Sequence, residues 1–523
     1  MYAEIAPLRR LPASLDFFDY EIPTHLSSQI RRGSLVTIPF KNQSLTGLVL
    51  KTKKHSSAPK IKSISAGLGY TIPPEQMEFL SWLGNYYHYP ASLLLPFFIP
   101  EPPKRRLITP LPTTNTISKH QETPTPRWLI YDQWKTVKTL LPPLLQDSGQ
   151  TLIIYPDQVN QRKLKKILLD LRVSFLDIPK RVQKNAYWQA WLQAQNEKII
   201  LGNWQSLFWP YQKLRRIIVM EADNPLYHRA EQNPRLHLND YLWKLAERHK
   251  AALHLFSLTP PIHMMLRSLS EKAIISQAVT ASGITLRDTS GQNKFGLSDQ
   301  SLRDIHQTTN KTLIFQNFLG SGSGHKLIHS LQALLNHEFP EKSVVTYGGE
   351  ALASSRELKT ADVIIATSKI FLTPLNFALT IMLGADASLA RPDYLATEEL
   401  RRHIFKLKLC SQDVIIETAT IEHPFWQTLT KYKEFYQLES LWRKKFHYPP
   451  FSQTYKFIAR SNSAGDQTAI HEIKKLLPDG IRQTAQGKSQ LLVKHEILDT
   501  LIDKILQKYH NQILIEKNPY YFQ

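Results

Sequence analysis

The chain has 523 residues, 42% of them hydrophobic and 21% charged, which is ordinary for packed globular proteins and excludes wholesale disorder and fibrous repeats. At roughly 150 residues per domain, this length predicts three or four domains. Lysine and arginine number 65 against 44 aspartates and glutamates, so the formal net charge is +21 at pH 7. A surplus of this size favours polyanionic partners, with nucleic acid ahead of an acidic membrane surface.

The sequence predicts neither a disulfide nor an export signal. The single cysteine, Cys410, excludes an internal disulfide and a four-thiolate zinc site. The first residues lack the basic segment and apolar core of a signal peptide. The longest apolar stretch, residues 93–99, contains Pro96 and is far shorter than the roughly 20 residues that span a bilayer. We therefore expect a soluble, cytoplasmic protein without a membrane partner.

The first hundred residues predict strands followed by a helix. Residues 35–40 and 46–50 are short β-type runs. The prolines at 73–74 suit the start of a helix that continues to Tyr87. Residues 101–127 are rich in Pro, Thr, Ser and Lys and have few apolar side chains, which is typical of a linker.

Beyond the linker, short apolar runs alternate with amphipathic stretches. Apolar strands that alternate with helices are typical of a parallel sheet covered on both faces. A polar stretch at 283–310 divides the runs into two sets. The runs lie at residues 151–155, 198–201, 216–219, 253–256, 312–315, 343–346, 363–365, 380–383 and 414–416.

The two sets resemble each other. In the first set an apolar run is followed by Glu221 and Asp223, and in the second set an apolar run is followed by Asp386. This repetition predicts two RecA-like parallel α/β lobes, the layout of helicase motors; two unrelated Rossmann-like layers are the alternative. The order β-α-β-α-β after Phe451 predicts a small C-terminal α+β domain. The expected fold class is multidomain α/β. The expected divisions are 1–100 (a β-rich N-terminal domain), 101–127 (linker), 128–282, 283–450 and 451–523.

A nucleotide-driven motor needs a phosphate loop, and the sequence lacks one. The pattern G-x-x-x-x-G-K-[ST] supplies backbone N–H groups and a lysine for the phosphates, and a hydroxyl for magnesium. Residues 130–139, where this loop is expected, contain no glycine and include the bulky Trp134. Residues 487–489 read Gly-Lys-Ser, but Arg482 stands where the first glycine is required. The glycine repeat at 320–324 lacks the Lys-hydroxyl pair and favours a connector.

Strand-end carboxylates are the second requirement, because they organise Mg²⁺ and activate water. Glu221 and Asp223 follow an apolar run and have the right chemistry to hold a metal; solvated strand-end acids are the favoured alternative. We treat Glu221, Asp223 and Asp386 as vestigial, and we assign no catalytic or metal-binding residue.

The sequence resembles the PriA family of primosomal replication-restart helicases, also called primosomal protein N′, over nearly its whole length. The matching segments are residues 18–20 with Pro23, 36–40, 47–49, 86–87, 202–208, 258–260, 392–394, 423–424, 435–436, 448–451 and 518–519. The resemblance implies an N-terminal 3′-DNA-end-binding domain, two helicase lobes and the family's C-terminal domain.

The departures from the family concern the motor. The phosphate loop is missing, Met220 stands where the first metal-binding aspartate is expected, and the family's eight zinc-binding cysteines have no counterpart. Residues 405–412 lack the Gly-Arg pairs of the second lobe's arginine-bearing motif. Four elements of the motor are lost while the DNA-end elements persist, which indicates lobes that no longer turn over ATP.

The resemblance further implies that Phe18, Asp19, Tyr20, Gly47 and Lys62 hold a 3′-terminal nucleotide. An ionised Asp19 can accept a hydrogen bond from a 3′-hydroxyl. An aromatic ring can stack on a base, Gly47 leaves room for close approach of the backbone, and Lys62 can meet a phosphate. The alternative is that the two rings are core residues and that Asp19 caps a turn.

The leading hypothesis is a DNA-binding protein of replication restart and primosome assembly that recognises forked or 3′-ended DNA and whose helicase lobes are inactive. The alternatives are an active ATP-dependent 3′→5′ DNA helicase with divergent motifs and a replisome interaction scaffold. The family uses ATP, magnesium and zinc, but this sequence supports none of them as a cofactor. Besides DNA, the implied partners are primosome or replicative-helicase-loading proteins and single-strand-binding protein.

Two sets of residues are candidates for further nucleic-acid contacts. The basic runs at 104–106 and 443–445 are candidate phosphate contacts, although Lys and Arg are scattered through the whole chain. The tryptophans at 188, 191, 204 and 209 could stack on bases, but core packing is the favoured interpretation.

Overall fold

The computed structural model describes residues 1–9, 11, 16–103, 127–130, 134–146, 149–228, 234–270, 274–276, 283–289, 296–316, 324–348, 351–391, 393–485, 488–495, 497 and 499–519. Most of the predicted linker, the basic run at 104–106 and most of the glycine repeat at 320–324 lie outside these residues. Among the described residues, none of the helices combines the length and the hydrophobicity that a bilayer span requires.

The N-terminal sheet has six strands in the order β5-β2-β1-β4-β3-β6. Neighbouring strands are antiparallel except β2 and β5, which are parallel. Two helices follow the sheet, and the first begins at Pro74 as the sequence predicts. The elements are β1 (Tyr2–Pro7), β2 (Phe18–Glu21), η1 (Thr24–Leu26), β3 (Ser34–Phe40), β4 (Gln43–Lys53), β5 (Lys62–Ser63), β6 (Ala66–Thr71), α1 (Pro74–Tyr87) and α2 (Ala91–Phe98).

Lobe 1 is built on a seven-stranded sheet in the order β13-β7-β12-β11-β8-β10-β9, and its strand pairs are parallel. The strands are β7 (Arg127–Ile130), β8 (Gln150–Ile154), β9 (Leu176–Asp177), β10 (Ile199–Gly202), β11 (Leu214–Val219), β12 (Ala252–Ser257) and β13 (Ile274–Ser276). The helices are α3 (Trp134–Leu140), η2 (Pro142–Leu145), α4 (Gln158–Asp170), α5 (Lys184–Gln193), η3 (Trp204–Phe208), η4 (Pro225–Tyr227), α6 (Leu238–His249) and α7 (Ile262–Ser270).

Lobe 2 repeats this plan with a sheet in the order β14-β20-β19-β15-β18-β16-β17, which is parallel except for the β16–β17 hairpin. The strands are β14 (Ile284–Asp288), β15 (Thr312–Gln316), β16 (Val344–Gly348), β17 (Ala351–Leu352), β18 (Val363–Ala366), β19 (Phe377–Leu383) and β20 (Ser411–Thr418). The helices are α8 (Asp299–Gln307), α9 (Gly324–Glu338), α10 (Ser355–Thr360), η5 (Ser368–Leu372), α11 (Ala385–Leu389), α12 (Ala396–Cys410), α13 (Pro424–Thr428) and α14 (Tyr432–Lys445).

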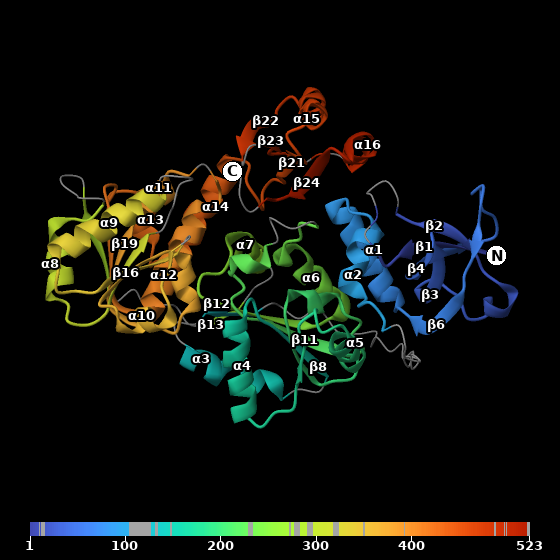
Figure 1. Cartoon of the computed structure of the whole chain (residues 1–523), viewed down its shortest axis with the longest axis horizontal. Helices are drawn as coiled ribbons and strands as arrows, with labels where there is room; N and C mark the ends of the chain where they lie inside the picture. The colour runs from blue at the N-terminus through green and yellow to red at the C-terminus, as the bar shows by residue number, and fades with distance from the viewer. Residues whose placement is uncertain are drawn as a thin grey trace.

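These two sheets confirm the predicted pair of RecA-like α/β lobes. Every residue of β8, β10, β15 and β18 is buried, as continuous apolar runs require when helices cover both faces of a parallel sheet. The lobes lie side by side, with the N-terminal sheet beyond lobe 1 and the C-terminal sheet above the junction (Figure 1).

The C-terminal part confirms the predicted α+β fold. Its four strands are antiparallel in the order β22-β23-β21-β24. The elements are β21 (Tyr455–Ala459), α15 (Ala464–Leu476), β22 (Ile481–Ala485), β23 (Lys488–Val493), α16 (Asp499–Tyr509) and β24 (Ile513–Lys517). The edge strand β22 was not predicted, because its sequence Ile-Arg-Gln-Thr-Ala has no apolar run.

Helices α1 and α2 join the N-terminal sheet to lobe 1 through aromatic packing. Phe208 of η3 contacts Phe79 of α1 and Phe98 of α2, with ring centroids 6.0 and 5.2 Å apart. Trp191 is fully buried and donates its indole N–H to the carbonyl of Phe98 at 3.0 Å. Trp188 and Trp209 are buried as well, which confirms core packing for these tryptophans.

The C-terminal sheet is fixed to the N-terminal helices and to lobe 1 by a buried charged cluster. Glu516 of β24 is 2% exposed, and its carboxylate lies 2.5 Å from the guanidinium of Arg235. The hydroxyl of Tyr89 donates to the carbonyl of Ile515 at 3.2 Å and accepts the backbone N–H of Arg235 at 3.1 Å. Beside this cluster, the ammonium of Lys517 lies 3.9 Å from the ring centre of Tyr86.

We predict that Glu516→Ala strongly destabilises the protein, because it removes the buried carboxylate and leaves the half-buried Arg235 without its ion-pair partner. Removing one partner of a buried ion pair costs about 3–5 kcal/mol. The measurement is urea unfolding followed by circular dichroism. Glu472→Ala is the matched control, because Glu472 is an exposed acid of the same part of the chain, paired with Lys475 within one helix. Equal unfolding midpoints for the two variants would contradict a role for the cluster.

Candidate functional site: the 3′-end residues and the cavity between the lobes

Four of the five predicted 3′-end residues lie on β2 and on the edge strand β5 of the N-terminal sheet. Strand β2 carries Phe18, Asp19 and Tyr20, and its parallel partner β5 places Lys62 beside Tyr20. Gly47 lies on β4, which β1 separates from β2. An added Cβ at Gly47 would lie 2.4 Å from a methyl carbon of Ile5, which is the β1 partner of Phe18. Packing against β1 therefore explains this glycine without a ligand.

Asp19 is held by two neighbours that the sequence did not indicate. The ammonium of Lys53 lies 2.8 Å from Oδ1 of Asp19, and the hydroxyl of Ser56 donates to Oδ2. Burial raises the pKa of Asp19, but the hydrogen bonds from Lys53 and Ser56 outweigh it and keep the pKa below its ordinary value. Asp19 is therefore ionised at neutral pH, as an acceptor of a hydroxyl proton must be. Strand pairing of β1 with both β2 and β4 brings Lys53 to this carboxylate.

The two predicted aromatic residues differ in accessibility. Tyr20 is 4% exposed, and its hydroxyl donates to the carbonyl of Pro39 at 3.2 Å. Phe18 is half-buried and packs edge-to-face on Phe40, with centroids 5.4 Å apart. Phe18 is thus the one of the two with ring surface open to a ligand. Lys62 is exposed, with its ammonium 3.5 Å from the carbonyl of Lys41.

The two acids of lobe 1 that the sequence analysis singled out, Glu221 and Asp223, follow β11 and are bound by protein groups. Glu221 has a left-handed backbone, φ +47°, and accepts hydrogen bonds from the side-chain amides of Asn160 at 3.1 Å and Asn224 at 2.7 Å. Asp223 accepts hydrogen bonds from two hydroxyl groups of β12 and the loop after it, Ser257 at 2.6 Å and Thr259 at 3.4 Å. Burial raises the pKa of Asp223.

Met220 is fully buried and belongs to the hydrophobic core of lobe 1, together with Ile153 and Phe256. The position expected to hold a first metal-binding aspartate is thus a core position. The corresponding acid of lobe 2, Asp386, accepts hydrogen bonds from the hydroxyls of Thr418 and Thr420 and from the backbone N–H of Ala419. Asp386 therefore ties α11 to the end of β20.

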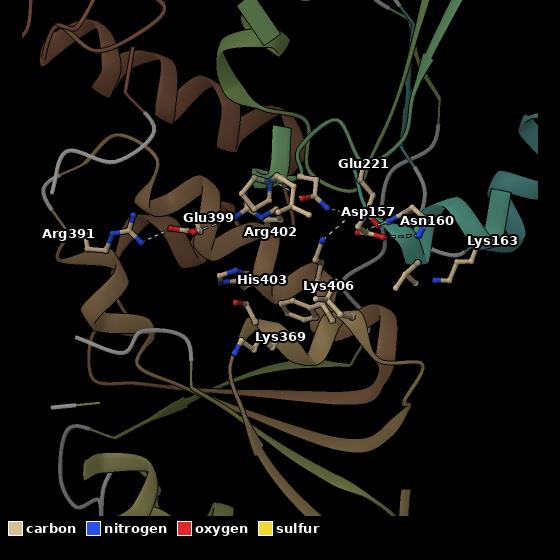
Figure 2. A pocket seen from close by; sticks show the side chains of 17 residues that line it. Asp157, Asn160, Lys163, Glu221, Lys369, Arg391, Glu399, Arg402, His403 and Lys406 are labelled. Atoms are coloured by element: carbon tan, nitrogen blue, oxygen red, sulfur yellow. Dashed lines mark hydrogen bonds and ion pairs between the residues drawn. The ribbon is translucent and has the colours of Figure 1, made fainter. Parts of the chain in front are cut away.

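An ion pair between the lobes is the central feature of the cavity. The ammonium of Lys406, on α12 of lobe 2, lies 3.1 Å from Oε2 of Glu221 in lobe 1. Figure 2 shows Lys406 pointing toward Glu221 from the opposite lobe. Arg402, one helical turn earlier, donates to the backbone carbonyl of Asp223 at 3.2 Å. Burial raises the pKa of Glu221, but the charge of Lys406 and the hydrogen bonds outweigh it and keep the pKa below its ordinary value.

The cavity has a volume of about 420 Å³ and is lined by both lobes. Its charged side chains are Asp157, Lys163, Glu221, Lys369, Arg391, Glu399, Arg402 and Lys406. Several are already bound within the protein: Arg391 lies 2.6 Å from Glu399, and Lys163 lies 4.7 Å from the ring centre of Trp134. Burial lowers the pKa of His403 to about 3, so this ring is neutral.

The phosphate-loop position before α3 can be compared with the cavity through Trp134, whose ring lies under the ammonium of the cavity residue Lys163. Residues 134–139, which begin α3, read Trp-Lys-Thr-Val-Lys-Thr and contain none of the glycines of the phosphate-loop pattern. Within the described parts of the chain, no cluster of three or more His, Cys, Asp or Glu side chains has the geometry to hold a metal ion.

The family model and the curated relatives that match this chain are all described as PriA proteins or as a PriA domain. A family model described as the PriA 3′DNA-binding domain (3′BD) matches residues 10–100. Replication restart protein PriA of Helicobacter pylori strain J99 is 26% identical over 293 residues, which cover 52% of this chain and 45% of that protein. The protein of the same name from Rickettsia prowazekii is 27% identical, over 50% of this chain and 44% of that protein. The matches thus span less than half the length of these relatives.

A further match extends over nearly the whole chain. Replication restart protein PriA of Chlamydia muridarum is 21% identical and covers 99% of this chain and 94% of its own length. Among solved structures, RecG bound to a three-way DNA junction aligns with 60% of this chain and 43% of its own, at 10% identity and a TM-score of 0.36. A DEAD box protein from Methanococcus jannaschii aligns with 59% and 86%, at 14% identity and a TM-score of 0.34.

We predict that Lys406→Met destabilises the protein by about 3 kcal/mol, because Glu221, whose side chain is only 14% exposed, loses its ion-pair partner. The double variant Glu221→Gln/Lys406→Met should recover most of this loss, and urea unfolding of the four proteins gives the coupling free energy. Since the pKa of folded Glu221 is depressed, the pair stabilises the protein above the ordinary glutamate pKa. That contribution should fade as the pH falls through the lower folded value. If the changes in the free energy of unfolding of the two single variants simply add up in the double variant at pH 7, the ion pair does not contribute to stability.

Proposed function

Because the matches support membership of the PriA family of replication restart proteins, we propose that this chain binds forked or 3′-ended DNA and helps assemble replication proteins there. In this proposal the N-terminal sheet receives the 3′ end, and the two lobes serve as a scaffold without ATP turnover. The proposed partners are primosome or helicase-loading proteins and single-strand-binding protein, and the proposed location is the cytoplasm.

The observation that carries the proposal for the lobes is the ion pair between Glu221 and Lys406. In a working phosphoryl-transfer site, carboxylates hold Mg²⁺ and a lysine of the phosphate loop meets the β- and γ-phosphates. Here Lys406 of lobe 2 supplies the positive charge beside Glu221, and Met220 has joined the core. The sequence at residues 130–139 contains no glycine, which supports the proposal that no phosphate loop offsets the phosphate charge.

The observation that carries the proposal for the N-terminal sheet is the ionised Asp19 at its edge. Asp19 lies beside Phe18, which keeps open ring surface, and near the exposed Lys62. A carboxylate, a stacking ring and a cation are the groups that a 3′-hydroxyl, its base and the neighbouring phosphate would contact. Lys53 adds a second cation next to the carboxylate.

We predict that the purified protein has no DNA-stimulated ATPase activity, since missing electrostatic stabilisation of the phosphates costs orders of magnitude in rate. The assay measures phosphate release from Mg-ATP with and without a forked DNA. A turnover of about 1 s⁻¹ or faster, within the range of working phosphoryl-transfer enzymes, that is lost in Glu221→Gln would instead establish an active helicase motor.

We predict that a fork with a 3′-hydroxyl leading-strand end binds about tenfold or more tightly than the same fork with a 3′-phosphate. A hydrogen bond to a charged group contributes about 1.5–3 kcal/mol, and the added phosphate charge would face Asp19. Asp19→Ala should abolish the preference. Glu21→Ala is the matched control, because Glu21 is an exposed acid on the same strand that accepts a hydrogen bond from Ser63.

The measurement is fluorescence anisotropy at one fixed salt concentration, since phosphate contacts make affinity salt-dependent. Lys53 keeps a second carboxylate, Glu4 at 3.1 Å, so Asp19→Ala does not leave this lysine alone. Equal affinity of the wild-type protein for both forks, together with no change in Asp19→Ala, would show that this edge does not read the 3′ end.

A further inference from the structure

An exposed aromatic surface lies where lobe 2 meets the C-terminal sheet. Four large hydrophobic side chains within eleven residues are exposed: Leu441 by 67%, Trp442 by 43%, Phe446 by 49% and Phe451 by 46%. We call these four residues, together with Tyr448, the α14 surface. Helix α14 itself lies beside the C-terminal sheet in Figure 1.

Helix periodicity explains why this surface faces outward and is held rigidly. The buried positions of α14 are the adjacent Phe435 and Tyr436, then Glu439 and Arg443, which follow at intervals of three and four residues. Arg443 is 1% exposed and donates to Glu398 at 2.9 Å and to the backbone carbonyl of Tyr394 at 2.8 Å. The prediction of Arg443 as a phosphate contact is therefore wrong, because this residue lies on the inward face.

The rings of the α14 surface belong to a continuous series. Trp442 lies 6.5 Å from His423 and 6.4 Å from Phe446, measured between ring centroids. Phe446 lies 6.5 Å from Tyr448, which in turn lies 5.7 Å from Tyr394. Of these rings Trp442 and Phe446 are exposed, and exposed rings in sequence can stack on successive unpaired bases, since every base has a π-face.

The charge around these rings favours an anionic partner. Residues 440–451 contain no aspartate or glutamate, and Lys444 and Lys445 are both exposed. From the C-terminal sheet, Lys494 lies over the ring of Tyr448 at 4.3 Å and donates to its hydroxyl at 2.9 Å. Aromatic rings interleaved with lysines suit a chain of bases and phosphates, because the rings can stack on bases and the lysines can neutralise phosphates.

We propose that the α14 surface binds single-stranded nucleic acid, with bases on Trp442 and Phe446 and phosphates on Lys444 and Lys445. The proposal rests on the proposed DNA-binding function and adds a second contact, separate from the N-terminal sheet. The 3′-end residues are not needed for it, so the two contacts can be tested independently.

The probe is a fluorescein-labelled dT20 blocked by a 3′-phosphate, and binding is followed by anisotropy. Trp442→Ala/Phe446→Ala should weaken binding about tenfold or more, because base stacking contributes roughly 1–3 kcal/mol per ring. Trp442→Phe should retain most of the affinity. Lys444→Gln/Lys445→Gln should reduce the slope of log K against log salt by about 0.7 per lost phosphate contact. Leu169→Ala, which truncates an exposed leucine of α4 beside lysines, is the matched control and should bind normally.

Each outcome decides the proposal. If Trp442→Ala/Phe446→Ala binds dT20 with wild-type affinity, the proposal for the α14 surface is wrong. The proposed 3′-end function is not affected by this result, because the fork assay with Asp19→Ala tests it separately. Absence of dT20 binding by the wild-type protein also overturns it, and preserved fork binding would then keep the proposed function. Loss of binding to a protein partner without loss of dT20 binding would assign the surface to protein docking, and the inference would be wrong. Circular dichroism checks that the exposed substitutions leave the fold unchanged.

Discussion

The arrangement of this molecule depends on a carboxylate that is almost completely removed from water. Glu516 is 2% exposed and lies where the C-terminal sheet, lobe 1 and the N-terminal helices meet. A buried charge is tolerated when a partner of opposite charge and hydrogen bonds replace its hydration. Arg235 supplies that charge, and Tyr89 bonds both to Arg235 and to the strand that carries Glu516. The pair therefore fixes one orientation of the C-terminal sheet against the rest.

A second ion pair performs the corresponding task between the lobes. Lys406 reaches Glu221 across the cavity, and Arg402 bonds to the backbone beside Asp223. In a nucleotide-driven motor the closure of two lobes depends on a ligand between them, whereas here side chains of the protein connect the lobes directly. These contacts between the lobes agree with the proposed scaffold role, because protein side chains themselves hold lobe 2 against lobe 1.

The sequence predicted the sheets well and the contacts between distant segments poorly. Continuous apolar runs such as residues 151–154 identify strands that are buried on both faces, whereas the polar edge strand β22 has no such signal. Glu221 was correctly placed after its strand, but its partner Lys406 is 185 residues away and nothing local indicates the pair. Arg443 is a different case, since the spacing of Phe435, Tyr436 and Glu439 already places it on the inward face of its helix.

The rigid junction links the two proposed DNA contacts. The N-terminal sheet and α14 lie on opposite sides of the region where the C-terminal sheet is held (Figure 1). Because Glu516 and its partners hold that sheet to lobe 1, and Lys494 of the same sheet bonds to Tyr448 of the α14 surface, folded structure connects Asp19 with that surface. When one contact binds a DNA molecule, the second contact meets the same DNA at a high effective concentration. This gain occurs only when the geometry of the DNA allows both contacts at once. Selectivity for a branched DNA can then arise from the spacing of the contacts, without a base-specific readout and without ATP turnover.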